Sequence, residues 1–285
     1  MKDLGKKVSH FRKLKGYTVK ELANNLCDES TLYRLEQGKQ VPRLEILNDI
    51  CLKLEIPFAA LFSVNEEVDK LKILCRESIY LEDYLLLEIA LDECDKVSEK
   101  ISSVYAKEEF RKFIQWHRAI MILKKDNRPQ EALRILNTLT NISNCGSELD
   151  INILNSIGLI HLSLNDNNAA YKIYRIINNK IMHHKVVEDS TILPRIGYNY
   201  AHTLYNLEDF HKALKIITDV LYYLEKHQLM YILGKTYHMK GLLSQKCGYI
   251  NEAIEDFQNA ILVFTLTKEN KNLLRAKEDL ADIIK

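Results

Sequence analysis

Four segments of the chain share one spacing of small and bulky residues, and this spacing constrains the fold more than any other feature. A small residue is followed by Ala 12 positions later, by a bulky residue four positions after that, and by another apolar or small residue three further on. The last segment has Gly241, Ala253, Phe257 and Ala260. The other three, of which the first fits more loosely, are Ile120, Ala132, Leu136 and Leu139, then Gly158, Ala170, Tyr174 and Ile177, then Ala201, Ala213, Ile217 and Val220. Such a repeat predicts stacked pairs of helices that bury a continuous core.

The spacing resembles that of tetratricopeptide repeats, in which two antiparallel helices form each repeat. The small residues would lie where the two helices approach most closely. The four repeat alanines are 38, 43 and 40 residues apart, rather than about 34, so longer helices or loops are expected. We also expect a degenerate first repeat between Leu71 and Val97 and a capping helix over 271–284. An irregular helical bundle is the alternative, but it would need four coincident spacings.

The composition favours helices and excludes several classes of protein. Of 285 residues only 9 are Gly and 4 are Pro, while 47% are hydrophobic, so long helices and a sizeable core are expected. The start of the chain lacks the apolar stretch of a signal peptide, and no uncharged run reaches the roughly 20 residues that span a bilayer. We therefore expect a cytoplasmic protein with no membrane partner.

The six cysteines are widely spread and do not form a metal-binding pattern. None stands in a C-x-x-C pair, and no His is placed to complete a zinc site. Reduced and mostly buried thiols are expected, with no metal and no cofactor.

Helix start and stop signals follow one another at short intervals in the first 63 residues. Apolar residues at positions 4, 8, 11 and 14 predict a helix that ends at Gly16. Thr18 and Glu21 have the spacing of a capping box, which opens a second helix.

A third and a fourth helix are predicted in the same way. Asp28 is expected to cap a helix over 29–37, which Gly38 ends. The next helix, over 44–54, is expected to end at Pro57. Two short helices joined by a tight turn, the second polar on its outer face, form a helix-turn-helix.

This pattern resembles the Xre/Cro/phage-repressor family, which has a lambda-repressor-like fold. The residues that carry the resemblance are Arg12, Gly16, Thr18, Glu21, Leu22, Ala23, residues 30–39, Pro42 and Leu44. The resemblance covers nearly all of the first 62 residues. It implies that the 29–37 helix enters the major groove of double-stranded DNA.

The resemblance also assigns contacts with DNA. It implies that base edges meet Glu29, Ser30, Tyr33 and Arg34, with Thr31 beside them. Arg34 suits a bidentate contact with guanine, and Glu29 can accept from cytosine N4. Phosphate contacts are expected from Arg12, Thr18, Lys20 and Lys39.

Charge supports these contacts only locally. The net charge is +1, but residues 1–20 contain seven basic residues and one acidic residue. A local basic face can carry phosphate contacts although the whole chain is nearly neutral. Two assignments have alternatives, because Arg12 can instead pair with Glu36 within the fold and Lys20 can be a solvated charge.

The repeats predict a second site. In a right-handed superhelix of about five degenerate tetratricopeptide repeats, the first helix of each repeat lines the inner face. Amides there can bind a peptide backbone, aromatic rings can form apolar pockets, and cations can hold a carboxylate. The candidate peptide-binding residues are Lys124, Asn155, Arg195, Tyr198, Asn199, His202, Tyr205, Lys235, His238 and Gln245. His117 and Met239 are expected on the same face. For any one residue, the alternative is a polar group that only faces solvent.

Taken together, the all-α chain is similar to the RRNPP group, the peptide-sensing transcription regulators of Gram-positive bacteria. The stretches that carry the similarity are residues 26–27, 30–38, 53–57, 113–116 and 123–125. Asn155 and Asn199 fall where that group uses asparagine to hold its signalling peptide. The resemblance implies a homodimer on a palindromic operator, a secreted and re-imported oligopeptide as ligand, and activation of transcription, with RNA polymerase as a further partner.

This resemblance divides the chain into three parts. They are a DNA-binding domain over 1–63, a linker helix or hinge over 64–75, and a peptide-sensing and dimerisation domain over 76–285. We expect the peptide to shift the population of conformations and so the separation of two DNA-binding domains.

Three other functions are alternatives to a peptide-sensing transcription regulator. An enzyme has no support, because the sequence lacks a nucleophile elbow, a phosphate-binding Gly loop and a metal motif. A repeat scaffold that captures a response regulator would carry a helical bundle in place of residues 18–38. A constitutive or phage-type repressor remains an alternative. Its repeats would serve only dimerisation or protein binding, so a test of peptide binding would distinguish it from a peptide sensor.

Overall fold

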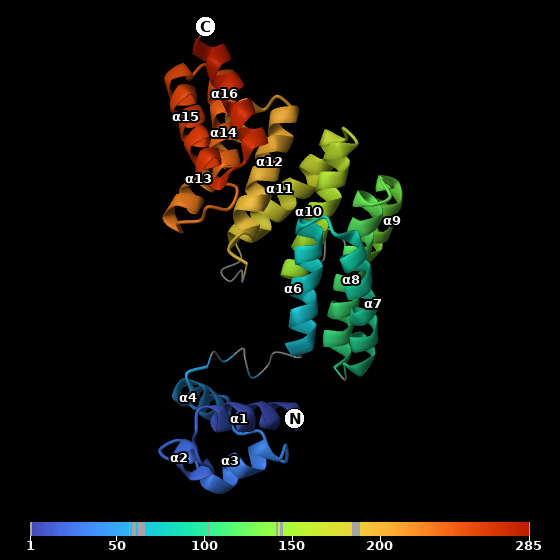
Figure 1. The fold of residues 1–285 in the computed structure, drawn as a ribbon, viewed down its shortest axis with the longest axis vertical. Coiled ribbons are helices and arrows are strands. Elements are labelled where there is room, and N and C mark those ends of the chain that lie inside the picture. The colour runs from blue at the N-terminus through green and yellow to red at the C-terminus, as the bar shows by residue number, and fades with distance from the viewer. Residues whose placement is uncertain are drawn as a thin grey trace. The chain divides into compact units, whose positions relative to one another are not determined.

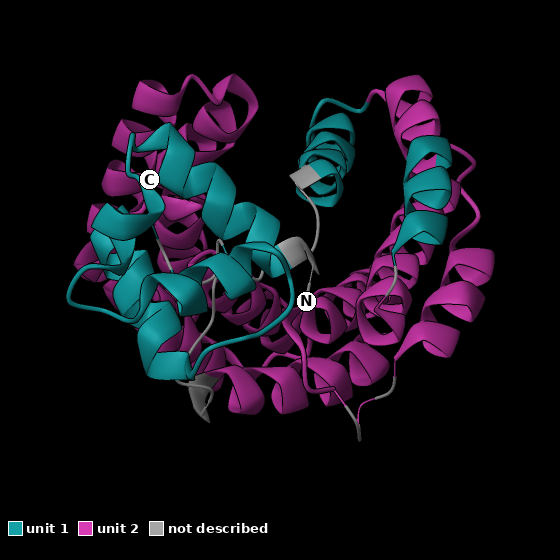
Figure 2. Ribbon diagram, turned by 90° about the horizontal axis from the view of Figure 1, so that it is seen from below, with its two compact units in different colours: residues 1–82, 92–101 teal, residues 83–91, 102–285 magenta. Residues whose placement is uncertain are grey.

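The computed structural model describes residues 2–56, 58, 61, 66–101, 103–140, 142, 145–183 and 189–284. Within these ranges every regular element is a helix and no strand occurs (Figure 1). The all-α prediction is therefore confirmed. The chain divides into two compact units, one of residues 1–82 and 92–101 and the other of residues 83–91 and 102–285 (Figure 2).

Four short helices open the first unit. They are α1 (Lys2–Leu14), α2 (Val19–Ala23), α3 (Glu29–Glu36) and α4 (Leu44–Leu54). Each contributes to one apolar core, whose buried members are Val8, Leu22, Ala23, Leu32, Leu35, Leu47, Ile50, Cys51, Leu54 and Leu61. This arrangement is the predicted helix-turn-helix, with α2 and α3 as its two helices.

Most of the predicted helix ends are present. Gly16 follows α1 with φ +75°, and Gly38 follows α3 with φ +68°, left-handed values that suit glycine. Thr18 and Glu21 form the predicted capping box at the start of α2.

The start of α3 and the end of α4 fall where predicted, but the details of these two helix ends differ from those expected. Asp28 has extended backbone before α3, but its side chain makes no capping hydrogen bond. Helix α4 ends at Leu54, because Glu55 adopts the left-handed conformation with φ 55° and reverses the chain there. Pro57, the expected stop, lies outside the described residues.

Helices α1 and α3 touch at Gly5. A Cβ atom on Gly5 would overlap the carbonyl oxygen of Leu35, so only glycine allows this approach. This contact at Gly5 was not predicted from the sequence.

Consecutive helix pairs make up the second unit. They are α8 (Val104–Lys124) and α9 (Pro129–Leu139), α10 (Glu148–Ser163) and α11 (Asn167–His183), α12 (Ile192–Asn206) and α13 (Phe210–Lys226), α14 (Leu233–Lys246) and α15 (Ile250–Thr267), and α16 (Asn270–Ile284). Each helix packs on the next, and α8, α10, α12, α14 and α16 also contact one another in sequence. In Figure 2 the helices of this unit follow an arc.

The predicted repeat positions fall on these pairs. All four repeat alanines are fully buried. A Cβ on Gly158 would come within 2.7 Å of the Tyr174 ring, and one on Gly241 within 2.8 Å of the Phe257 ring. The small residues therefore lie where the two helices of a repeat are closest, as predicted.

Two further helices occupy the region of the expected degenerate repeat. They are α6 (Glu66–Tyr80) and α7 (Tyr84–Lys100). Residues 66–75 of the predicted linker belong to α6, whereas 64 and 65 lie outside the described residues. All six cysteines are free thiols, and Sγ of Cys75 and Cys94 lie 3.9 Å apart between α6 and α7. None of the described helices has the length and apolar character needed to cross a membrane.

Candidate DNA-binding and peptide-binding residues

Helix α3 has one buried face and one exposed face. Leu32 and Leu35 are completely buried in the core. The opposite face is exposed and carries Glu29, Ser30, Tyr33 and Arg34. Thr31 is half-buried beside them. The side chains predicted to read base edges therefore share the solvent-facing side of one helix.

The start of α2 is fixed by the capping box. Thr18 Oγ1 accepts a hydrogen bond from the Glu21 N–H over 3.1 Å, and Glu21 Oε2 accepts from the Thr18 N–H over 2.7 Å. The bond from the Thr18 N–H lowers the pKa of the Glu21 carboxyl. Because the Thr18 oxygen acts as the acceptor, its hydroxyl proton is available for a phosphate oxygen. Lys20 and Lys39 are exposed.

Arg12 has a structural role instead of the predicted phosphate contact. Its Nε and Nη2 donate to the two carboxylate oxygens of Glu36 over 2.6 and 2.9 Å, and Nη1 donates to the Tyr17 carbonyl over 2.8 Å. Arg12 is only 8% exposed. The structure thus shows the alternative pairing within the fold, because a guanidinium bound to Glu36 and Tyr17 has no free fork for DNA.

Nine of the ten predicted peptide-binding residues lie on α10, α12 and α14, the first helices of three successive repeats, and a set of seven lies before the last turn of these helices. We call this set the inner row, and its members are Asn155, Arg195, Tyr198, Asn199, His202, Lys235 and His238. The remaining three lie near the ends of their helices. Lys124 is exposed at the end of α8, while Tyr205 and Gln245 are half-buried near the ends of α12 and α14.

Two asparagines of the inner row bind each other. Asn199 Nδ2 donates to Asn155 Oδ1 over 2.8 Å, which joins α12 to α10. The Tyr174 hydroxyl on α11 donates to the same oxygen over 3.3 Å. Burial raises the pKa of Tyr174, so its hydroxyl stays a donor. Asn155 itself is 6% exposed. The two predicted backbone-binding amides are therefore brought together.

Arg195 is held by the segment before α12. Its Nη2 donates to Asp189 Oδ2 over 2.8 Å and to Thr191 Oγ1 over 2.9 Å. The guanidinium also lies 6.0 Å from the centre of the Tyr231 ring. Nε is buried and finds no partner in the described part of the chain. Arg195 therefore keeps one unused donor.

Tyr198 and His202 are four positions apart on α12 and so share one face of the helix. Burial raises the pKa of Tyr198 above its ordinary value, and the positive charge of Arg275 on α16 offsets part of this rise. Burial and, to a lesser extent, the same charge both lower the pKa of His202. On α14, His238 Nε2 lies 2.6 Å from Asp279 Oδ2 of α16. The capping helix thus adds charged groups beside the inner row.

The predictions for His117 and Met239 are wrong. His117 is 1% exposed, its Nδ1 bonds the Phe113 carbonyl over 2.9 Å, and its ring lies 3.9 Å from the Phe113 ring. Met239 is 6% exposed in the core of the last repeat. Each residue turns a helix by about 100°, so an error of one position moves a side chain from the inner face of the repeats to their core.

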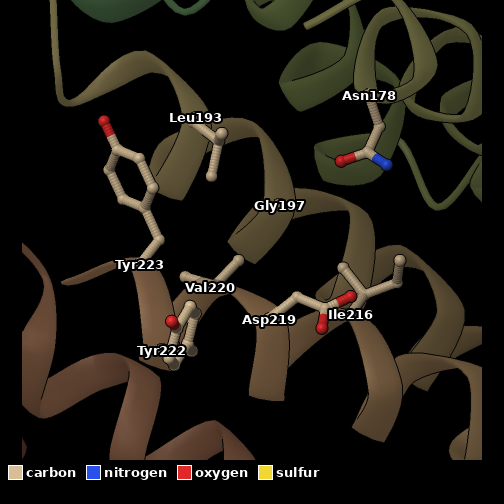
Figure 3. A pocket seen from close by; sticks show the side chains of 8 residues that line it. All are labelled: Asn178, Leu193, Gly197, Ile216, Asp219, Val220, Tyr222 and Tyr223. Atoms are coloured by element: carbon tan, nitrogen blue, oxygen red, sulfur yellow. The ribbon is translucent and has the colours of Figure 1, made fainter. Parts of the chain in front are cut away.

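A separate pocket lies between α11, α12 and α13 (Figure 3). It is lined by Asn178, Leu193, Gly197, Ile216, Asp219, Val220, Tyr222 and Tyr223. Leu193 and Gly197 are each two positions from Arg195 and Asn199, which places them on about the opposite side of α12. None of the predicted peptide-binding residues lines this pocket.

The domain comparisons agree with this two-part arrangement. Residues 90–277 match the RNPP family C-terminal domain, and residues 9–61 match a helix-turn-helix family. The chain belongs to the RNPP family. This RNPP-family protein is a peptide-responsive DNA-binding transcription regulator of the RRNPP group, and not an enzyme. The comparison with curated protein sequences gives no match.

Solved structures of other proteins have the same fold. PlcR from Bacillus thuringiensis, in complex with the peptide PapR7 and DNA, gives a TM-score of 0.79 at 21% identity over 98% of this chain and 99% of that chain. The Streptococcus dysgalactiae pheromone receptor Rgg2 gives 0.66 at 15% identity over 98% and 99%. Apo PlcR gives 0.61 at 18% identity over 100% of both chains. The sequence stretches that carry the resemblance to the RRNPP group resemble PlcR in particular. The sequence therefore predicted a paralogue of PlcR.

Three groups near the inner row were missed from the sequence. They are Asp189, Arg275 and Asp279. Arg275 had a detectable signal, because Arg195, Lys235 and Arg275 follow one another at intervals of 40 residues. Asp189 had none, since its contact with Arg195 depends on the path of a loop.

Proposed function

We propose that this RNPP-family protein is a cytoplasmic quorum-sensing activator, which binds a palindromic operator as a homodimer under the control of a short signalling peptide. The observation that carries the proposal is the inner row, where Asn155 and Asn199 meet between two repeats. A pair of amides offers both donors and acceptors, which a peptide backbone requires. RNA polymerase is the expected further partner of an activator.

Two relatives support this assignment. PlcR has been solved with the peptide PapR7 and DNA, and ComR from Streptococcus thermophilus with DNA and its signalling peptide ComS. By analogy, α3 and its surroundings would bind DNA through Thr18, Lys20, Glu29, Ser30, Thr31, Tyr33, Arg34 and Lys39. In this proposal residues 1–63 bind DNA, 64–75 form the hinge, and 76–285 bind peptide and dimerise.

The proposed mechanism is a population shift. A peptide can change the balance of conformations only if it binds one of them more tightly than the other. Asn155 and Asn199 belong to different repeats, so a peptide that contacts both would favour one relative placement of α10 and α12. Such a change, accumulated along the repeats, would alter the separation of the two DNA-binding domains of a dimer.

One observation favours the second candidate, a constitutive repressor. The Asn155 side-chain oxygen already accepts from both Asn199 and Tyr174. These amides could therefore serve only to join the repeats, which would then function in dimerisation alone.

A titration separates the two candidates. Short synthetic peptides are added to the full-length protein, and operator affinity is measured by fluorescence anisotropy. We expect one peptide to change operator affinity in the wild type and in the control Asn179→Ala, an exposed site on α11. Asn199→Ala should lose the response but keep its basal operator affinity. An operator affinity that no peptide changes would support the constitutive repressor.

A further inference from the structure

Three cations occupy equivalent positions on successive first helices. Arg195 lies on α12, Lys235 on α14 and Arg275 on α16, each 40 residues from the next. Helix α14 contacts both α12 and α16 (Figure 1). The repeat geometry therefore carries one basic position along three neighbouring helices.

One contact between side chains fixes the facing sides of α14 and α16. His238 Nε2 and Asp279 Oδ2 are 2.6 Å apart. His238 follows Lys235 by three positions and Asp279 follows Arg275 by four, and helix positions three or four apart share a face. Lys235 and Arg275 therefore lie one turn before the contact, on the same sides of their helices.

Arg275 also acts on α12. Its positive charge contributes to the lowering of the His202 pKa, after burial, and it opposes the rise of the Tyr198 pKa. Such a contribution requires the guanidinium to lie near both side chains. The charge of Arg275 thus reaches the α12 part of the inner row.

In the described part of the chain, no acidic side chain forms an ion pair with either of the two outer cations, Lys235 and Arg275. Asp189 pairs with Arg195, and Asp279 is bonded to His238. Lys235 and Arg275 are both exposed, and neither forms an ion pair with any residue that the structure describes. This end of the inner row therefore presents two cations without anionic partners.

We propose that Lys235 and Arg275 form a carboxylate-binding site at the α14–α16 end of the inner row, which selects peptides that place a carboxylate there. The inference rests on the proposed peptide-sensing function and adds the chemistry and direction of the ligand. The amides of Asn155 and Asn199 hold the backbone, and the carboxylate lies towards the capping helix. That carboxylate is either the C-terminus of the peptide or the side chain of an Asp or Glu.

Three synthetic heptapeptide libraries test the site on the full-length protein. The first has free C-termini but no Asp or Glu, the second has amidated C-termini with Asp and Glu, and the third has amidated C-termini with neither. Retained peptides are quantified by mass spectrometry. We expect the third library to be retained about tenfold less than the better of the other two, since bonds to a charged group are worth about that factor. The better library identifies the source of the carboxylate.

Matched variants locate the effect. Lys235→Gln and Arg275→Gln should reduce this preference about tenfold, while Lys277→Gln, on the other side of α16, should retain it. Melting temperatures should stay unchanged, because all three residues are exposed. Equal retention of all three libraries, or equal loss in Lys277→Gln, would overturn the carboxylate site but leave peptide sensing intact. Retention of no peptide at all would overturn both proposals.

Discussion

Arg12 and Arg34 belong to the same small unit but have opposite environments. Arg12 is 8% exposed and bonded through three nitrogens to Glu36 and Tyr17. Arg34 is exposed near the end of α3. Substitution of the first should affect folding, and substitution of the second should affect recognition of DNA.

Arg34→Ala should weaken operator binding selectively. The loss of a bidentate contact with guanine costs about 1–3 kcal/mol on the operator, with little change on random DNA of the same length. Equilibrium binding to both DNA molecules at one salt concentration measures this difference. Equal losses on the two would mean that Arg34 contacts the phosphate backbone.

Arg12→Met should destabilise the DNA-binding unit. Removal of one partner leaves the Glu36 carboxylate buried and unpaired, which costs about 3–5 kcal/mol. Urea unfolding followed by circular dichroism measures the loss. The double variant Arg12→Met/Glu36→Leu is the control and should recover much of the stability, since no unpaired charge remains. Normal stability combined with weak operator binding in Arg12→Met would contradict the structural role.

At the scale of single elements, the start of α10 depends on Asp150. Its carboxylate accepts hydrogen bonds from Lys112, from the Thr140 hydroxyl over 2.8 Å, and from the N–H groups of Gly146 and Ser147 over 3.0 and 3.1 Å. Burial alone would raise the pKa of Asp150, but these bonds outweigh it and lower the pKa well below its usual range. The ionised carboxylate thus joins α8, α9 and α10.

Asp150→Asn should remove a pH-dependent part of the stability. A carboxyl whose pKa is lower in the folded protein stabilises it above the unfolded pKa of about 3.9, and the contribution is lost as the pH falls below that value. Stability of the wild type should therefore decline more steeply below about pH 4 than that of the variant, which starts about 1–3 kcal/mol lower at pH 7. Urea midpoints measured between pH 7 and pH 3 test this. Parallel curves would contradict a role for the ionised form.

The spacing of small and bulky residues predicted the helix pairs well where that spacing depends directly on side-chain packing. Gly158 and Tyr174, 16 positions apart, were paired correctly because one must be small for the other to fit. Details that depend on exact backbone geometry were less accessible. Asp28 has a favourable backbone conformation yet no capping bond, and a non-glycine residue, Glu55, ends α4 in the left-handed conformation.

At the scale of the whole molecule, the two-part organisation was predictable, whereas the exact domain bounds stay a prediction. The division between units passes through α7, where residues 83–91 group with the repeats and 92–101 with the N-terminal unit. A division inside a continuous helix leaves no change in composition to detect. Likewise, the contact between His238 and Asp279 joins positions 41 residues apart and depends on how the repeats stack.

A dimeric regulator should be sensitive to the spacing of its operator. Two half-sites about one helical turn apart, roughly 34 Å or 10 base pairs, would present the same face of the DNA to both α3 helices. Insertion of five base pairs should sharply weaken binding in a mobility-shift assay, because it rotates one half-site to the opposite face. Binding that does not depend on spacing would indicate monomers acting independently.

The hydrogen bond between Asn155 and Asn199 has a consequence for discrimination. Asn155 Oδ1 already accepts from Asn199 and Tyr174, so a peptide that donates to this oxygen exchanges a hydrogen bond instead of adding one. Most short peptides would gain almost nothing from such an exchange. Only a peptide with further favourable contacts would remain bound. The hydrogen bond between Asn155 and Asn199 would thereby exclude most of the peptide fragments that a cell produces.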